Sequence, residues 1–225
     1  MLRFLLDFIY PRRGVCMGCG SMFGCERDDV CDACREKLSQ SWVGVRQPNR
    51  KSGLDGTAFA YKYYGVAGNI VRRMKYSCVH VLSEEMGAAV AKAACLMRIP
   101  EIDFVTSVPM HPKRLRTRGG NHGEVLAKSA AKQLGAPYKA ALIRTRDGVQ
   151  QARLSDETRK KNLEGAFTAD PAFAEDMKNA VVLLVDDVYT TGATARECAL
   201  ALRKAGAAKV YFAGYAVSQS GKRRK

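Results

Sequence analysis

One segment near the C-terminus, residues 181–194, limits the possible folds more than any other part of this chain. Its sequence is VVLLVDDVYTTGAT: a run of apolar and β-branched residues, then two acids, then a loop that carries hydroxyl groups and a glycine. An apolar run without alternation is typical of a central parallel strand that is buried on both faces. We therefore expect a buried strand over Val181–Asp186, with the acids and the loop at one edge of a parallel sheet.

Strands and helices alternate along the chain from about residue 56. Hydrophobic periodicity and turn residues predict strands over Ala58–Tyr64, Asp103–Val108, Leu142–Arg144 and Lys209–Val217, and helices over Ile70–Met74, Ser83–Met97, Asn121–Leu134 and Thr194–Ala205. Gly135 and Gly206 stand where the last two helices should end. The predicted fold is α/β, with a mostly parallel sheet flanked by helices, whose ligands bind beyond the carboxyl ends of the strands.

The acid pair, Asp186 and Asp187, ends the predicted buried strand and so lies where such a sheet binds ligands. Two adjacent carboxylates repel each other, and burial removes part of their hydration, so they need a cation or hydroxyl donors. Ribose hydroxyls are donors of this kind. The pair therefore indicates a sugar site.

The loop after the acids, Tyr189–Thr194, combines hydroxyl groups with a glycine directly before a helix. Glycine lets the backbone turn its amides towards an anion, and a helix N-terminus carries the positive end of the helix dipole. The simpler alternative is an ordinary strand-to-helix turn in which Thr194 is the N-cap. Because a buried strand and two acids precede the loop, we favour a phosphate site.

Residues 181–194 resemble the diphosphate-sugar signature of the type I phosphoribosyltransferases. The resemblance implies that Asp186 and Asp187 hold the ribose hydroxyls. It implies that the 5′-phosphate is held by Thr190, Thr191, Gly192, Ala193 and Thr194. It also implies a magnesium ion that bridges diphosphate and ribose oxygens, as a hard cation that keeps much of its water does.

A basic loop follows the predicted strand that ends near Val108. It carries four cations within six residues, Lys113, Arg114, Arg116 and Arg118. These charges would repel one another without an anion, and a diphosphate pairs well with guanidinium and ammonium groups. The alternative is a solvated basic loop without a ligand. We predict that Lys113 and Arg114 contact the diphosphate.

Two C-x-x-C pairs, Cys16 with Cys19 and Cys31 with Cys34, lie in a segment that is poor in large apolar residues. This spacing lets four thiolates complete one tetrahedral zinc site, which leaves no position open for a reacting water and is therefore structural. A redox-active pair is the alternative, but such sites need one pair in a βαβ context. Of the other cysteines, we expect Cys95 and Cys198 to be buried, together with Cys78, and Cys25 to be a spare loop residue.

The order of these segments is similar to that of the ComF family, competence proteins that join a small zinc module to a phosphoribosyltransferase-like domain. The residues that carry the resemblance are the two cysteine pairs, Lys75 with Tyr76, the VPMHPKRLRTRGGN loop, Gln151–Asn162 with Gly165–Phe167, and the DDVYTTGAT loop. Residues 145–162 are polar and charged without core periodicity, so we expect them to be mobile. The resemblance implies that this segment would close over a substrate and exclude water. The sequence departs from the family at Gly120 and Gly148, which weakens residue-level inferences for that segment.

The resemblance implies a role in taking up transforming DNA as a single strand, with competence or helicase-type proteins as partners. The formal charge of +15 is compatible with phosphate-backbone contacts, although 8% aromatic residues show no evident stacking platform. The alternative is a phosphoribosyltransferase that acts on an unknown acceptor in nucleotide metabolism, with Asp186, Asp187 and Lys113 as catalytic residues. A third possibility is a regulator that binds phosphoribosyl diphosphate without reaction.

The expected organisation is an N-terminal helix and zinc module over residues 1–45, a phosphoribosyltransferase-like domain over 56–218 and a basic tail over 219–225. No apolar run approaches the roughly 18–20 residues of a membrane span, and Asp7 interrupts the apolar N-terminus, so we expect no integral membrane segment and no secretory signal. A short amphipathic helix docked on the protein is favoured there over one bound to a membrane surface. Without an export signal, we expect a cytoplasmic protein with reduced cysteines.

Overall fold

The computed structural model describes residues 15–22, 29–76, 83–112, 115–116, 120–146 and 163–218. Its centre is a five-stranded sheet with the strand order β1-β2-β7-β6-β3. The strands are β1 (Trp42–Arg46), β2 (Gly56–Lys62), β3 (Phe104–Ser107), β6 (Val181–Tyr189) and β7 (Lys209–Val217). All neighbours pair in parallel except β1, an antiparallel strand at one edge. The α/β class and the mostly parallel sheet are therefore confirmed.

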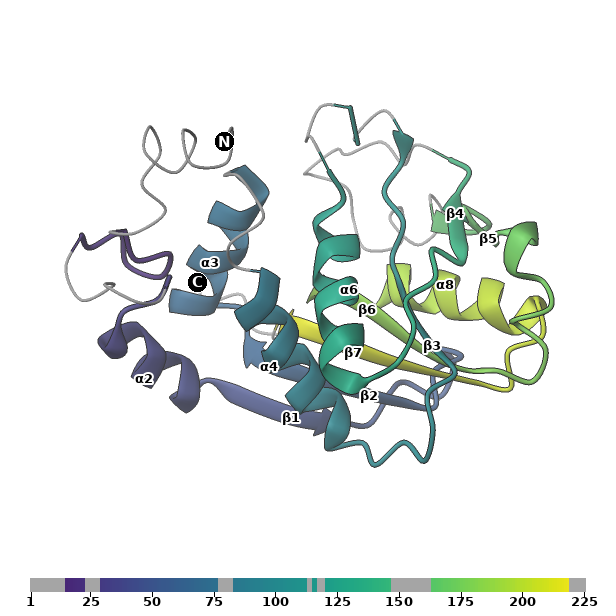
Figure 1. The fold of residues 1–225 in the computed structure, drawn as a ribbon, viewed down its shortest axis with the longest axis horizontal. Coiled ribbons are helices and arrows are strands. Elements are labelled where there is room, and N and C mark those ends of the chain that lie inside the picture. The colour runs from purple at the N-terminus through teal and green to yellow at the C-terminus, as the bar shows by residue number, and fades with distance from the viewer. Residues whose placement is uncertain are drawn as a thin grey trace.

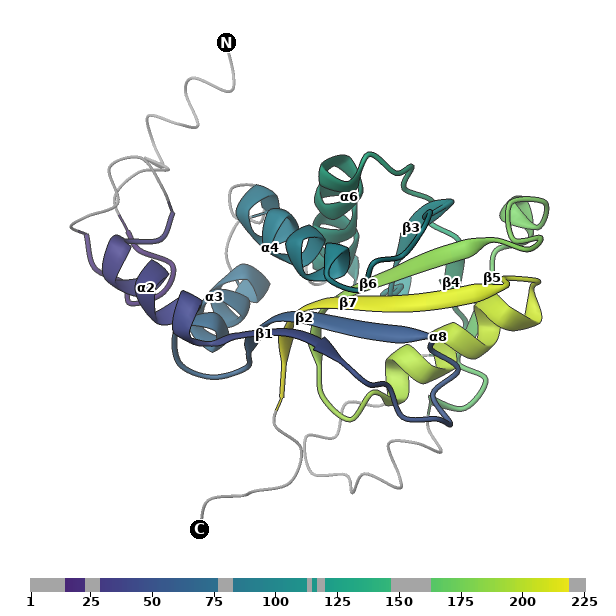
Figure 2. The same cartoon turned by 90° about the horizontal axis from the view of Figure 1, so that it is seen from below.

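Helices cover both faces of this sheet (Figures 1 and 2). One face packs against α3 (Gly65–Tyr76), α4 (Ser83–Cys95) and α6 (His122–Leu134), and α2 (Asp32–Gln40) adjoins the same core. The other face packs against α8 (Ala193–Lys204) and a two-stranded antiparallel sheet of β4 (Leu142–Arg144) and β5 (Phe167–Ala169), next to the 3-10 helix Pro171–Phe173. In the described part of the chain, no helix has the length and apolar character needed to cross a membrane.

The core explains why β6 lacks the alternation of a half-exposed strand. Leu183 and Val185 pack in the cluster under α3, α4 and α6, whereas Val182 and Leu184 pack in the cluster under α8. All four are fully buried, and full burial of one such side chain contributes roughly 1.5–3 kcal/mol. The strand is thus fixed from both sides, and this holds the residues at its carboxyl end in place.

Most predicted elements appear with shifted ends. The strand Lys209–Val217 is confirmed as predicted, and α6 has Asn121 as its N-cap and the left-handed Gly135 (φ 67°) as its C-cap. The strand predicted at 181–186 continues to Tyr189, because its pairing with β7 runs on to Val217. Strand β1 was not predicted, and it pairs with β2 from within the proposed residue 1–45 module. The division of the chain at residue 45 stays a prediction.

Candidate functional site

The acid pair lies near the carboxyl end of β6, the edge at which the parallel strands open to ligands. Both residues are partly buried. The backbone N–H of Asp187 donates to Oδ1 of Asp186 at 2.8 Å, which turns that carboxylate back over the strand. Lys75, at the end of α3, places its Nζ 3.0 Å from Oδ2 of Asp187. Two acids and one cation therefore form a compact group at this edge.

Within this group, the ionised form of Asp186 is disfavoured. Burial, and after it the negative charge of Asp187, raises the pKa of Asp186 well above its ordinary value, although the Asp187 N–H and Lys75 oppose the shift. A carboxyl group with a raised pKa is one whose ionised form lacks compensation. A bound cation or a set of hydroxyl donors would provide that compensation.

Lys75 is a site residue to which the sequence assigned no role. It was noted only as part of the family resemblance, because a lysine in the last turn of a helix is common and carries no specific signal. The structure brings it to Asp187 by packing α3 on the sheet face that also receives α4 and α6. Its side chain is 27% exposed and that of Asp187 is 13% exposed, so the pair is largely shielded from water.

The loop between β6 and α8 has the backbone form expected for an anion cradle. Gly192 is left-handed (φ 78°) and serves as the N-cap of α8, without a side-chain capping bond. Thr194 lies inside the first turn, so the alternative in which Thr194 caps the helix is wrong. A Cβ on Gly192 would lie 2.1 Å from the Tyr189 hydroxyl, so this position requires glycine.

The hydroxyls of the loop differ in their exposure. Thr190 and Thr191 are exposed, and Thr194 is partly buried. Thr191 Oγ1 accepts a bond from the N–H of Ala193 at 3.4 Å. Together with the first turn of α8, these groups form a polar rim beside the acid pair.

The start of α6 closes another side of the site. A Cβ on Gly123 would lie 3.5 Å from Oδ1 of Asp186, an ordinary contact, and 3.3 Å from Oδ1 of Asn121, a tight one, so Gly123 lies directly beside the acid. Asn121 Oδ1 accepts from the Gly123 N–H at 3.1 Å, and its Nδ2 donates to the Val108 carbonyl at 3.3 Å. The N-terminus of α6 therefore faces the acid pair, and its dipole favours negative charge there.

A cavity of about 390 Å³ adjoins the loop on the α8 side. Its lining includes Asn49, Lys51, Tyr189, Thr191 and Arg196. Arg196 Nε donates to the Lys51 carbonyl at 3.1 Å, which ties the connection between β1 and β2 to α8. This connection falls between the expected residue 1–45 module and the expected residue 56–218 domain, and its approach to the loop depends on the pairing of β1, which was not predicted.

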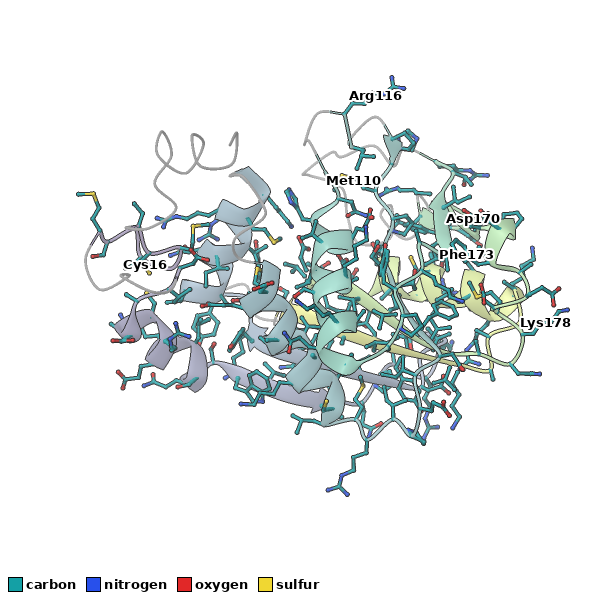
Figure 3. All side chains as sticks on the ribbon, viewed as in Figure 1. Cys16, Met110, Arg116, Asp170, Phe173 and Lys178 are labelled. Carbon is teal, nitrogen blue, oxygen red and sulfur yellow. The ribbon has the colours of Figure 1, made fainter. Side chains whose placement is uncertain are left out.

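The basic loop is described only in part. Lys113, Arg114 and Arg118 lie outside the described residues, as does the segment Gln151–Asn162. Arg116 is exposed at the far end of the loop and projects from the body of the protein (Figure 3). The structure thus brings together the acid pair and the residue 190–194 loop, and it leaves the contact of Lys113 and Arg114 with a diphosphate as a prediction.

The four paired cysteines converge at one point. The Sγ atoms of Cys16, Cys19, Cys31 and Cys34 all lie within 4.8 Å of one another, and three of the four residues are buried. The N–H groups of Gly18 and Cys31 each lie 3.3 Å from Cys16 Sγ, and that of Ser21 lies 3.5 Å from Cys19 Sγ. Backbone donors aimed at sulfur suit thiolates, so this set of four could hold a metal ion.

The pKa values of two of the clustered thiols are shifted in opposite directions. Burial raises the pKa of Cys16, but the N–H groups of Cys31, Cys19 and Gly18 outweigh it and bring the pKa to about 6. Burial and the neighbouring sulfurs raise the pKa of Cys34. Of the remaining cysteines, Cys198 is buried as expected, whereas Cys95 is exposed at the end of α4 and that prediction was wrong. Cys25 and Cys78 lie outside the described residues.

Comparison with known proteins shows which families and proteins this chain resembles. Residues 121–225 match the family described as phosphoribosyl transferase domain. DNA utilization protein YhgH of Salmonella typhi is 35% identical over 113 residues, which are 50% of this chain and 48% of that protein. Competence protein F of Haemophilus influenzae is 31% identical over 127 residues, 56% of this chain and 54% of that protein.

A third relative is an enzyme by its name. Amidophosphoribosyltransferase of Haemophilus influenzae is 28% identical over 172 residues, which cover 72% of this chain and 30% of that protein. The chain thus spans about half the length of the first two relatives and less than a third of this one.

Proposed function

The chain belongs to the ComF family, and from this premise we propose that it binds phosphoribosyl diphosphate with magnesium and serves DNA uptake by handling single-stranded DNA. The observation that carries the first half of the proposal is the group of Asp186, Asp187 and Lys75 beside a left-handed Gly192 at the start of α8. At one edge of the sheet, this group offers carboxylates that can accept bonds from hydroxyls and a helix N-terminus that attracts an anion.

In this proposal the ribose lies over the acid pair. Its two hydroxyls donate to Asp186 and Asp187 and thereby offset the burial and the repulsion that raise the pKa of Asp186. The 5′-phosphate accepts bonds from the hydroxyls and backbone amides of Thr190, Thr191, Gly192, Ala193 and Thr194. The helix dipole of α8 adds attraction for its negative charge.

The diphosphate would extend towards the basic loop. Lys113 and Arg114 are the residues proposed to pair with it, since they follow β3, which lies next to β6 in the sheet. Magnesium, when bound, would neutralise charge on the diphosphate. The uncompensated Asp186 carboxyl fits such a hard cation.

We further propose that Cys16, Cys19, Cys31 and Cys34 hold a structural zinc ion. Four thiolates leave no coordination position for a reacting water, so the ion would hold the fold together and would not take part in the reaction. None of the six described cysteines forms a disulfide, which fits a reducing compartment, and we propose a cytoplasmic location.

The second half of the proposal concerns DNA. Two relatives are named for DNA utilization and for competence, and the chain carries 37 lysines and arginines against 22 acids. This excess attracts a phosphate backbone in a salt-dependent manner. Competence or helicase-type proteins remain the proposed partners.

The alternative function is phosphoribosyl transfer to an unknown acceptor in nucleotide metabolism, and the similarity to an amidophosphoribosyltransferase favours it. In that reaction the bond between the ribose carbon and the diphosphate breaks as the acceptor bonds to the carbon. Lys113 would stabilise the charge that develops on the departing diphosphate, while Asp186 and Asp187 hold the ribose.

One pair of assays separates the two functions. Binding of a single-stranded oligonucleotide that weakens steeply with salt and survives Asp186→Asn supports DNA handling. Release of diphosphate in the presence of an acceptor, abolished by Asp186→Asn, supports transfer. Saturable binding of phosphoribosyl diphosphate with no oligonucleotide binding and no release of diphosphate indicates a regulator instead.

A further inference from the structure

A second and larger cavity lies away from the acid pair, where the cysteine segment meets the sheet. It has a volume of about 600 Å³ and is enclosed by α2, α3, α4 and the strands β1, β2 and β7. We refer to it as the junction cavity. Cavities of about 300–1,000 Å³ are of a size that takes small molecules or parts of larger ligands. The proposed diphosphate-sugar site does not use it.

The wall of the junction cavity is aromatic. Trp42 of β1 and Tyr61 of β2 are directly paired in the sheet, and their rings lie 5.5 Å apart at 82°. Tyr215 of β7 continues the row, with its ring 5.2 Å from that of Tyr61. Met86 and Ile70 form an apolar floor. A flat, unsaturated ligand matches a wall of this kind, because planar rings gain most from contact with other planar rings.

The rim of the junction cavity is charged. Arg35 of α2 lies 3.7 Å from Glu85 of α4, and both side chains are partly exposed. Lys92 of α4 is exposed and holds its Nζ 5.2 Å from the centre of the Trp42 ring. Two cations therefore lie beside an aromatic wall, and the carboxylate of Glu85 next to Arg35 can accept a bond from an amino group.

Trp42 and Tyr61 of the aromatic wall lie towards the same edge of the sheet as the acid pair. Val188, one residue after the acids, is in register with Ala216 of β7, which is in register with Tyr61, which is in register with Trp42. Three steps between neighbouring strands separate β6 from β1, which is roughly 14 Å at the usual strand spacing. This separation is short enough for one extended ligand to span.

We infer that the junction cavity is a site where a base of single-stranded nucleic acid stacks flat on one of the rings of Trp42 and Tyr61 and meets the other edge-on, with the adjoining phosphates held by Arg35 and Lys92. Stacking on aromatic rings next to a basic rim is how proteins bind single strands without reading their sequence. The overall aromatic content of 8% hides this feature, because it does not show that Trp42, Tyr61 and Tyr215 lie next to one another. The inference rests on the proposed DNA function and gives it a location.

The test uses Trp42 as its own reporter, because the chain has a single tryptophan. The full-length protein is titrated with a short oligothymidylate while tryptophan emission is followed. We expect saturable quenching that weakens as salt is raised. Phosphoribosyl diphosphate with magnesium is the comparison ligand, and it should leave the emission unchanged even where calorimetry shows that it binds.

Two lysine variants provide a matched control. Lys92→Glu and Lys132→Glu make the same change of charge on exposed lysines, but only Lys92 lies at the cavity. Lys132 is on α6, and its Nζ lies 4.0 Å from Glu84. We expect Lys92→Glu to weaken oligothymidylate binding substantially more than Lys132→Glu does. Tyr61→Leu should weaken binding by at least about fivefold, whereas Tyr61→Phe should preserve it, which separates stacking from loss of folding.

Two outcomes overturn the inference. If the oligothymidylate binds but the emission is unchanged and the two lysine variants weaken binding equally, the strand binds elsewhere and only the DNA function survives. If no oligonucleotide binds, the inference and the DNA function both fall. Failure of phosphoribosyl diphosphate to bind while the oligothymidylate quenches emission removes the diphosphate-sugar site alone and leaves the cavity as inferred.

Discussion

The cysteine cluster and the acid pair both gather groups that bind cations, but they are enclosed to different degrees. The four sulfur atoms lie within 4.8 Å of one another, in a segment that shares a hydrophobic cluster with α3 and α4. Asp186 and Asp187 are only partly buried at an open sheet edge, where the side chain of Lys75 is within reach. The first region is closed around its centre, and the second is open.

This difference separates stability from binding. An ion in the closed cluster would act on folding, since removing it leaves buried thiolates without a partner. At the open acid pair, a ligand and its cation can take the place of Lys75 beside the carboxylates. Substitutions there should therefore affect ligand binding before they affect folding. Because the ionised form of Asp186 is poorly compensated, removing its charge should even stabilise the protein without ligand.

The largest effect is expected at the cysteine cluster. We predict that Cys16→Ser lowers the free energy of unfolding by about 4–5 kcal/mol, the range of a lost metal site, and removes bound zinc from the purified protein. Chemical denaturation and zinc analysis measure the two quantities. Cys95→Ser is the matched control, because that thiol is exposed and outside the cluster, and its effect should stay within about 0.5 kcal/mol. Retention of zinc by Cys16→Ser would contradict the closed metal site.

At the acid pair, we expect a substitution to raise the free energy of unfolding instead of lowering it. The raised pKa of Asp186 means that the folded protein keeps this proton while the unfolded chain loses it, so the acid costs stability as pH rises above the ordinary aspartate value of about 4. Asp186→Asn keeps an oxygen for the Asp187 N–H and removes the charge. We predict a stabilisation of about 1–3 kcal/mol near pH 8 that vanishes near pH 4.

The same substitution at an exposed acid sharpens this test. Asp103 also accepts a backbone N–H, that of Val181 at 2.7 Å, but it is exposed. Asp103→Asn should lack the pH-dependent gain. Denaturation curves of both variants at several pH values provide the measurement. An equal gain in the free energy of unfolding in both variants would show that the surroundings of Asp186 do not disfavour its ionised form.

A smaller effect is expected from Lys75. Lys75→Met removes the cation beside Asp187, and we predict a loss of about 1–2 kcal/mol in the protein without ligand, as for a hydrogen bond between charged groups that are largely shielded. Lys128→Met breaks an ion pair with Glu124 on an exposed helix surface and should cost at most about 0.5 kcal/mol. Equal losses would remove the distinction between the acid pair and an ordinary surface.

The sequence predicted the elements that a local residue pattern specifies. The run Val181–Val185 can only be a strand buried on both faces, and Asn121 and Gly135 mark the ends of α6 by their side chain and backbone form. The strand β1 was not predictable in this way. It is short, it is followed by a polar turn, and it exists because it pairs with β2.

The same distinction applies to the site. Asp186, Asp187 and the residue 190–194 loop are adjacent in sequence, so a local pattern was sufficient to identify them. Lys75 joins them only through the packing of α3 against the sheet. The junction cavity needs side chains of α2, α4 and three strands, and the spacing of its residues in the sequence gives no sign that they meet.

The most direct test of the account is a calorimetric titration of the zinc-loaded protein with phosphoribosyl diphosphate and magnesium, alongside the variant in which Asp186 and Asp187 are both changed to Asn. The account predicts saturable binding by the native protein and a loss of at least about 100-fold in affinity in the double variant, equal to about 2.7 kcal/mol. Absence of binding by the native protein would contradict the proposed diphosphate-sugar site.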